Sequence, residues 1–201
     1  MKKGMLTGLI IGGIIVLFII MTYSWGQSTY NNMVTLNEAV TQSWSQVENQ
    51  YQRRADLIPN LVSTVKGYAN FEKSVLVDVT EARSKVSQFT VSKDVLNNPQ
   101  AFQKFQALQG SLSGALSRLL VTVERYPDLK ANQNFLQLQA QLEGTENRIS
   151  VERRRFNQAV QKYNTTIKLF PASTIAGMFG FSPKQYFQAT TGTEKPPTVK
   201  F

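Results

Sequence analysis

The chain has 201 residues, enough for one membrane anchor and one domain of ordinary size. It contains neither cysteine nor histidine, which excludes disulfides, thiolate nucleophiles, Ser-His-Asp catalysis and the usual zinc and haem ligand sets. The net charge of +9 would favour anionic lipid or polymer, but the basic residues are scattered along the chain. We therefore expect no cofactor, no metal site and no enzymatic activity.

The first predicted element is a transmembrane helix over residues 4–23, which contain no charged side chain. At about 1.5 Å per residue this helix is about 30 Å long, the thickness of the hydrocarbon core. Lys2 and Lys3 precede it, and the next basic residue is Arg53, so the positive-inside rule predicts a cytoplasmic N-terminus and a domain on the other side. This topology disfavours a nucleic-acid partner.

A cleavable signal peptide is the competing interpretation, because Ser24-Trp25-Gly26 has small residues at the spacing of a peptidase site. The apolar run is longer than the usual range of about 7 to 15 residues, which favours a retained anchor. Small residues at Gly4, Gly8 and Gly12 form a ridge on which a homo-oligomer could pack, although glycine is common in such helices in any case.

An amphipathic helix is predicted over residues 30–51, where bulky side chains recur at alternating steps of three and four. Residues 51–62, Tyr-Gln-Arg-Arg-Ala-Asp-Leu-Ile-Pro-Asn-Leu-Val, are then predicted to form a hairpin tip. Asp56 is a candidate helix N-cap, and Pro59 is tolerated in the first turn of a new helix. The alternative is one long helix kinked at Pro59.

Three further amphipathic helices follow. The second has its apolar positions between residues 61 and 89, and the third begins at Asn98-Pro99, an N-cap followed by proline. The fourth begins after an N-cap at Asp128 or Asn132 and ends before Pro171. Short turns make consecutive helices antiparallel neighbours. The predicted fold is therefore all-α, an N-terminal transmembrane helix followed by an antiparallel up-down-up-down four-helix bundle.

This arrangement divides the chain into three parts and predicts two features of the core. The parts are residues 1–26 as cytoplasmic tail and anchor, 27–188 as the bundle with its C-terminal apolar segment, and 189–201 as a disordered tail. Trp44 is expected level with Gly114, which would leave room for the indole. A buried polar layer, in which a carboxylate needs a cationic or donor partner, is expected nearer the membrane. Its candidates are Asn37, Glu72, Glu146, Arg148 and Arg153.

The apolar segment after the fourth helix is too short and too interrupted by glycine and proline to span a membrane. If left undocked it would expose a large apolar patch, which soluble monomers seldom tolerate. We expect it to close the base of the bundle, with a short final helix starting at Ser182-Pro183, and the alternative is attachment to the lipid interface. Its apolar residues are Phe170, Ile175, Met178, Phe179, Phe181, Tyr186 and Phe187.

Several ordered blocks between residues 30 and 187 resemble the LemA family. They are Trp44-Ser, the 51–62 run quoted above, Thr64-Val-Lys-Gly-Tyr-Ala, Thr80-Glu-Ala-Arg83, Glu124-Arg-Tyr-Pro-Asp-Leu-Lys130, Thr145-Glu-Asn-Arg-Ile149 and Phe179-Gly-Phe-Ser-Pro. The resemblance implies a bacterial, single-span protein of the plasma membrane with an extracytoplasmic helical bundle and no settled activity. It also implies possible partners among membrane metalloproteases or TPM-domain proteins, and it supplies no catalytic residue.

Three classes of function follow. The leading hypothesis is a non-enzymatic interaction or scaffold protein of the envelope, whose distal tip faces a partner. The tip residues are Arg53, Arg54, Asp56, Arg125, Asp128 and Lys130. The same residues are also explained as turn chemistry alone, by caps, a proline start and ion pairs. The other two classes are a protein that binds the lipid surface and an enzyme that acts on envelope polymers without histidine or cysteine.

Overall fold

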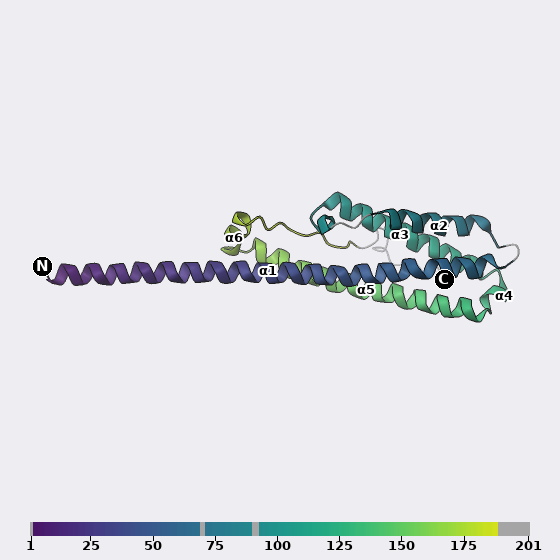
Figure 1. Ribbon diagram of the computed structural model, residues 1–201, viewed down its shortest axis with the longest axis horizontal. Coiled ribbons are helices and arrows are strands. Elements are labelled where there is room, and N and C mark those ends of the chain that lie inside the picture. The colour runs from purple at the N-terminus through teal and green to yellow at the C-terminus, as the bar shows by residue number, and fades with distance from the viewer. Residues whose placement is uncertain (1, 69–70, 90–92, 189–201) are drawn as a thin grey trace, which may run out of the picture.

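The structure is a computed structural model that describes residues 2–68, 71–89 and 93–188 (Figure 1). All regular secondary structure in these ranges is helical. The elements are α1 (Lys2–Lys66), α2 (Lys73–Gln88), a short 3-10 helix η1 (Lys93–Leu96), α3 (Pro99–Val123), α4 (Pro127–Lys130), α5 (Gln133–Lys168) and α6 (Ala172–Met178). The predicted all-α class is thus confirmed, while the tail predicted at 189–201 lies outside the described residues.

The predicted hairpin tip at 51–62 is wrong, because α1 continues through Pro59 to Lys66. Pro59 cannot donate to the carbonyl four residues earlier, which would ordinarily break the helix. Here the Ala55 carbonyl accepts a hydrogen bond of 3.0 Å from Arg83 Nε on α2. Pro59 itself is exposed, while Ile58, Leu61 and Val65 continue the buried face of α1. A side chain from the neighbouring helix therefore replaces the missing donor.

The later helix starts follow the capping signals in the sequence. Asn98 Oδ1 accepts from the backbone N–H groups of Gln100 and Ala101 at 3.0 and 3.1 Å, directly before Pro99. Of the two candidates for the last long helix, Asn132 is the cap, since its Oδ1 accepts from Phe135 N at 3.1 Å. Side-chain oxygens of this kind satisfy N–H groups that have no partner within the helix.

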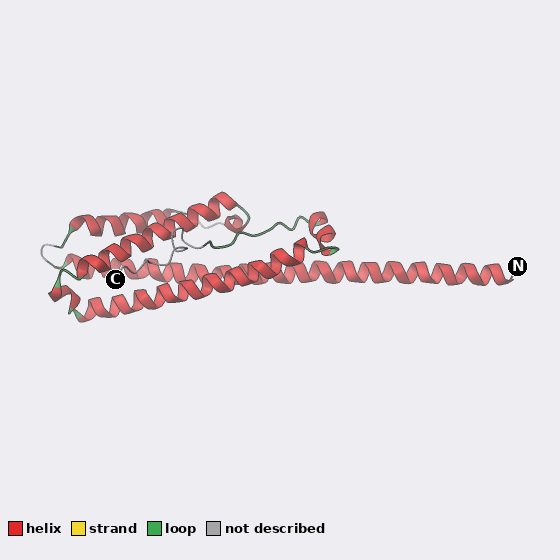
Figure 2. Ribbon diagram, turned by 180° about the vertical axis from the view of Figure 1, so that it is seen from behind, coloured by secondary structure: helices red, strands yellow, loops and turns green. Residues whose placement is uncertain are grey.

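The long helices lie along a common axis, and α1 extends far beyond the others (Figures 1 and 2). Along most of its length α5 packs against α1, and α2 packs against α3. The chain turns between α1 and α2 at one end of this domain, which is also where α4 joins α3 to α5 (Figure 1). We call this the distal end, because the free part of α1 leaves the opposite end.

Residues 6–23 of α1 are exposed, and α1 is the one described helix long and apolar enough to cross a membrane. The helix passes from this stretch into the domain without interruption. Buried side chains begin at Met33 and recur at Val40, Trp44 and Val47. The apolar N-terminal stretch and the first helix of the domain are therefore parts of one helix.

The core of the domain consists of two separate apolar clusters. The proximal core, on the side of the apolar stretch, is rich in aromatic rings, which are Trp44, Tyr51, Phe102, Phe105, Phe156, Tyr163 and Phe187. The distal core is mostly aliphatic and includes Ile58, Leu61, Leu112, Leu116, Leu119 and Leu142. Between the two clusters, α1, α3 and α5 each bury one polar residue: Arg54, Gln109 and Thr145.

The expected role of Gly114 is wrong. Trp44 packs against the rings of Phe102, Phe105 and Phe156, at centroid distances of 5.8, 5.2 and 5.5 Å. A Cβ added at Gly114 would meet no atom within 4 Å, so this glycine faces open space. The indole is accommodated by other aromatic residues, and Gly114 needs a different explanation.

The C-terminal segment docks on the domain, although in a different form from the one expected. Its helix, α6, starts at Ala172 and ends at Met178, and no helix begins at Ser182-Pro183. Gly180, with φ at +74°, follows α6, and an extended segment of residues 181–188 then runs back along α5. Phe187 is buried in the proximal core, with its ring 6.0 Å from Trp44.

Candidate functional site, a polar cleft above a buried arginine

Arg54 is the central residue of the polar layer between the two cores and is only 1% exposed. Its Nη1 lies 2.6 Å from Glu146 Oε1 on α5 and 2.6 Å from Ser113 Oγ on α3. Its Nη2 donates to the side-chain and backbone oxygens of Gln109. A buried guanidinium is tolerated only with such partners. The arginine thus ties α1, α3 and α5 together, while its Nε has no hydrogen-bond partner.

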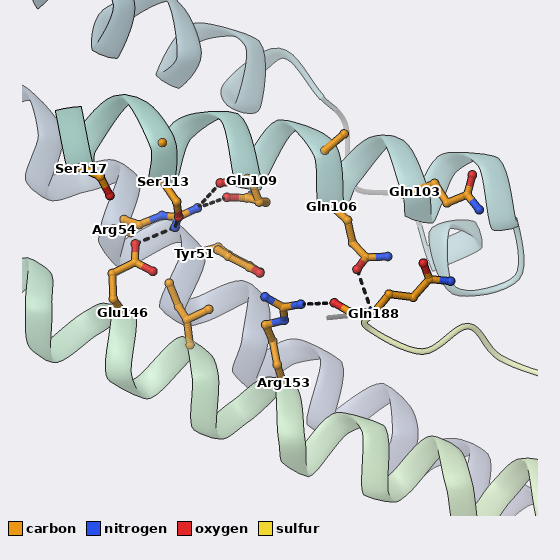
Figure 3. Close-up of a pocket in the computed structure, with 14 residues that line it drawn as sticks. Tyr51, Arg54, Gln103, Gln106, Gln109, Ser113, Ser117, Glu146, Arg153 and Gln188 are labelled. Atoms are coloured by element: carbon orange, nitrogen blue, oxygen red, sulfur yellow. Dashed lines mark hydrogen bonds and ion pairs between the residues drawn. The ribbon is translucent and has the colours of Figure 1, made fainter. Parts of the chain in front are cut away.

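An open cleft of about 560 Å³ lies above this arginine, between α3 and α5 (Figure 3). We call it the Arg54 cleft. Gln103, Gln106, Gly110 and Ser117 of α3 form one wall, and Glu146 and Arg153 of α5 lie on the other side. A Cβ added at Gly110 would meet no atom within 4 Å. This glycine therefore widens the cleft and relieves no crowding in the core.

The chain's own segment 184–188 runs along α5 in extended form, held by side-chain amides, and reaches the mouth of this cleft at Gln188. Asn164 of α5 exchanges two hydrogen bonds with the backbone of Lys184, at 2.9 and 2.8 Å. Asn157, two turns earlier on α5, exchanges two with the backbone of Phe187, both at 2.9 Å. Because an extended chain advances about 3.3 Å per residue, three residues match two turns of helix. The two asparagines thus bind the main chain at two points three residues apart, through its N–H and C=O groups and not through its side chains.

Gln188 completes the row at the mouth of the cleft. Its backbone N–H donates to Gln106 Oε1 at 3.1 Å, and its carbonyl accepts from Arg153 Nη2 at 3.0 Å (Figure 3). The Arg153 guanidinium also lies over the Phe187 ring, 4.6 Å from its centroid. Both walls of the Arg54 cleft therefore hold polypeptide backbone at the point where the described chain ends.

Burial changes the acid–base behaviour of two groups around this site. Burial raises the pKa of the Tyr51 hydroxyl above its usual value of 10.0, opposed by the nearby charges of Arg153 and Arg54. Burial lowers the pKa of Lys184, whose Nζ lies 5.6 Å from the Tyr163 ring centroid. Both shifts disfavour the charged form. The shift of the Tyr51 pKa keeps its hydroxyl protonated at neutral pH.

The residues predicted for the distal tip separate into two groups. Asp56 lies ten residues before the end of α1, or about 15 Å along its axis, so Arg53, Arg54 and Asp56 lie away from the tip. Arg53 and Asp56 are exposed, and Gln52 donates to Asp56 at 2.8 Å. Arg125, Asp128 and Lys130 do lie at the distal end, all exposed. The tip was misplaced because the helix was predicted to stop before Pro59.

The predicted polar layer is also wrong in most of its members. Glu72 has a side chain 47% exposed and pairs with Arg125 at 3.0 Å at the distal end, far from half-buried Asn37. Arg148 is exposed, and Arg153 belongs to the Arg54 cleft. Only Glu146 takes part in the observed layer, as the partner of Arg54. The prediction placed Glu72 within the second helix, part of the way down the bundle. In the structure α2 begins at Lys73, so Glu72 precedes the helix and lies at the distal end.

Sequence reasoning missed Gln109, Ser113, Asn157 and Asn164, although Gln109 carried a signal. Gln109 stands in the buried series Phe102, Phe105, Gln109, Leu112 and Leu116, where an apolar residue is expected. Asn157 and Asn164 are seven residues apart, on one helix face, but their ligand is an irregular segment. Across residues 2–68, 71–89 and 93–188, no group of three or more carboxylates is placed to hold a metal ion.

These features define a class, an all-helical protein whose longest helix begins with a stretch able to cross a membrane. The family model described as the LemA family matches residues 43–201, and the chain belongs to this family. The Magnetosome proteins MamQ 1 and MamQ 2 of Paramagnetospirillum magneticum are each 26% identical over 184 residues, covering 83% of this chain and 67% of theirs. Protein LemA of Metamycoplasma hominis is 26% identical over 179 residues, covering 87% and 78%. None of these names indicates catalysis.

Proposed function

We propose that this protein is a membrane-anchored interaction protein of the bacterial envelope, without enzymatic activity, that binds an extended polypeptide segment of a partner in the Arg54 cleft. Residues 4–23 form its span in the plasma membrane, and Lys2 and Lys3 keep the N-terminus in the cytoplasm. The helical domain is then extracytoplasmic. Membership of the LemA family and the exposed apolar stretch of α1 support this placement.

In this proposal the domain is an up-down-up-down bundle of α1, α2, α3 and α5. The turns after α1 and α3 lie at the distal end, and the connection from α2 to α3 lies towards the other (Figure 1). Consecutive helices joined by short connections run antiparallel in this way. The cleft then lies on the side of the bundle, between α3 and α5, and faces the periplasm or cell exterior. Pairing of two spans through Gly4, Gly8 and Gly12 stays a separate prediction.

The observation that carries the proposal is the hold on residues 184–188. Asn164, Asn157, Gln106 and Arg153 bind the backbone of that segment, and Gln188 lies at the mouth of an open cleft. Side-chain amides bind any extended backbone, because every residue except proline offers one N–H and one C=O. The rest of the α3 wall of the cleft offers the same chemistry in Gln103 and Ser117, whereas Gln109 and Ser113 hold Arg54. A second extended segment is the ligand that these groups fit.

The glycines on the α3 wall support the same conclusion. A glycine inside a helix costs about 1 kcal/mol relative to alanine. Gly110 and Gly114 lie within α3 with open space beside them, so alanine would fit at both. The stability lost at these two glycines is explained if the open space beside them holds a ligand, because functional sites are often less stable than they could be.

The test is site-specific photocrosslinking in intact cells. A benzophenone amino acid at Gln103, an exposed residue of the cleft wall, should form an adduct with one membrane or envelope protein. The matched control is the same group at Gln137, which is exposed on α5 outside the cleft. An adduct of equal yield from both positions, or from neither, contradicts the proposal. Metalloproteases and TPM-domain proteins of the membrane are the first candidates to compare with the adduct.

A further inference from the structure

The apolar residues on either side of α6 are sorted into two groups by their exposure. Ala176 and Phe187 are buried, and Ile175 and Phe181 pack against the proximal core. Phe170 is 86% exposed and Met178 is 74% exposed, and Leu169 and Phe179 are each 59% exposed. We call these last four residues the basal patch. Single exposed apolar residues are ordinary, but a cluster of four around one short helix needs a covering partner.

The basal patch lies at the end of the domain where the apolar stretch of α1 emerges. α5 ends at Lys168, immediately before Leu169, at the end opposite the distal tip (Figure 1). α6 packs on α1 beside Gly26, where Ile175 Cδ1 lies 3.9 Å from the position of an added Cβ. The Phe179 ring is 4.7 Å from the ring of Tyr30. These contacts fix the height of α6 on α1.

That height coincides with the membrane interface. Gly26 and Tyr30 follow Tyr23 by three and seven residues, about 5 to 10 Å along the helix axis. Each headgroup layer is about 5 to 8 Å thick outside the hydrocarbon core. The exposed Tyr23 and Trp25 lie at the same level, as interfacial aromatic residues do. The basal patch is therefore level with the headgroups of any bilayer that holds residues 4–23.

No hinge lets the patch turn away from this surface. α1 is one continuous helix from the apolar stretch to Tyr30, where Phe179 and Phe181 pack against it. α6 is also tied to α5, which packs along α1. Exposed Lys168 borders the patch and suits an anionic headgroup. A partner protein would have to displace lipid from this position, whereas lipid is already present.

We propose that α6 and the basal patch insert into the headgroup layer of the bilayer that holds α1, as a second, interfacial attachment of the domain. Two attachments, one spanning and one lying on the surface, fix the direction of the domain relative to the membrane. α6 then sets which surfaces of the domain face a partner in the same membrane. This inference concerns lipid and does not depend on the proposed role of the Arg54 cleft.

The test uses the full chain in nanodiscs that hold one copy each, with anionic and zwitterionic lipid. Because the chain has no cysteine, Phe170→Cys or Met178→Cys can carry a single NBD fluorophore. The control is Val121→Cys, which is 71% exposed on α3 near the distal end. We expect blue-shifted emission, quenched by lipids with a nitroxide at the headgroup or upper chain, at 170 and 178 and not at 121. Emission at 170 and 178 equal to that at 121 would overturn the proposal.

The alternative is that a second copy of the chain covers the basal patch. Nanodiscs that hold one copy each exclude this contact. If 170 and 178 become protected only in vesicles with many copies, the patch is an interface between chains and the proposal is wrong. A second variant, Phe170→Ser with Met178→Ser, tests the consequence, because both residues are exposed and their loss leaves the core intact. Energy transfer from a dye at 121 to a lipid acceptor should then report a broader range of distances. An unchanged distribution would also overturn the proposal.

Discussion

The two cores of the domain differ in composition and in how the chain builds them. The distal core consists mainly of leucine and valine from α1, α2, α3 and α5, the long helices that follow one another along the chain. The proximal core is rich in aromatic rings and includes Phe187, which follows the last long helix by almost twenty residues. Arg54 and its partners lie between them. Neighbouring helices thus suffice for the distal core, whereas the proximal core needs a separate docked segment.

The largest expected effect is in the proximal core, from Phe187→Ala. The ring packs within 5.0, 5.4 and 6.0 Å of Phe102, Phe156 and Trp44, so its loss leaves a cavity. Truncating a buried phenylalanine costs about 3 to 5 kcal/mol. Denaturant unfolding of the full chain in micelles, followed by tryptophan fluorescence, measures the loss. Tyr186→Ala, at an exposed neighbour, should change the free energy of unfolding far less, and equal losses would mean that Phe187 is not part of the core.

The boundary between the cores should respond unequally to the loss of its two charges. Glu146→Ala leaves the buried Arg54 cation without its counter-ion, at a cost of about 3 kcal/mol. Arg54→Met should cost less, because the Glu146 side chain is already 41% exposed and can turn to water. Arg53→Ala, at an exposed neighbour, is the control and should cost less than about 0.5 kcal/mol. If Arg54→Met is the more harmful of the two, the layer is held by packing and not by charge.

The next largest effect is expected from loss of the hydrogen bond between Arg83 of α2 and the Ala55 carbonyl of α1. Arg83→Met leaves the Ala55 carbonyl without a donor, because Pro59 cannot supply one, and should cost about 1 to 2 kcal/mol. In a Pro59→Ala background the helix restores its own donor, so the same change should cost about 1 kcal/mol less. A double-mutant cycle on the free energy of unfolding measures this coupling. Additive losses would show that Arg83 does not replace the missing N–H.

The smallest effect is expected from Tyr51, next to the boundary between the two cores, and it concerns how the free energy of unfolding depends on pH. Burial raises its pKa above 10.0, so above pH 10 the unfolded chain loses this proton while the folded chain keeps it. The folded state then binds more protons, and the free energy of unfolding falls as pH rises. Tyr51→Phe should show a smaller loss between pH 9 and 11 than the unaltered chain. Because Tyr163 and Lys184 titrate equally in both chains, the difference reports Tyr51 alone, and identical pH profiles would contradict the assigned burial.

The sequence predicted the helices far better than their contacts. Periodicity and caps predicted the helical class, the starts at Pro99 and after Asn132, and the end of the last long helix before Pro171. Pro59 misled the prediction because its effect depends on Arg83, a residue on another helix that no local signal connects to it. The polar layer was misplaced for the same reason, since a wrong turn position shifts the height of every later residue. Asn157 and Asn164 share one face of α5, but the segment that they bind is irregular and has no periodic pattern in the sequence.

The partner-binding role of the Arg54 cleft is tested most directly by filling it. Gly110→Phe directs a ring towards the cleft, because Gly110 lies in the cleft wall and a Cβ added there meets no atom within 4 Å. The matched control is Gly144→Phe, at an exposed glycine of α5 that also faces open space and lies outside the cleft wall. The measurement is the yield of the photocrosslinked adduct from position 103 in intact cells, with chain abundance held equal. We predict at least a tenfold loss with Gly110→Phe and no loss with Gly144→Phe, whereas an undiminished adduct with the cleft filled would contradict the proposed function.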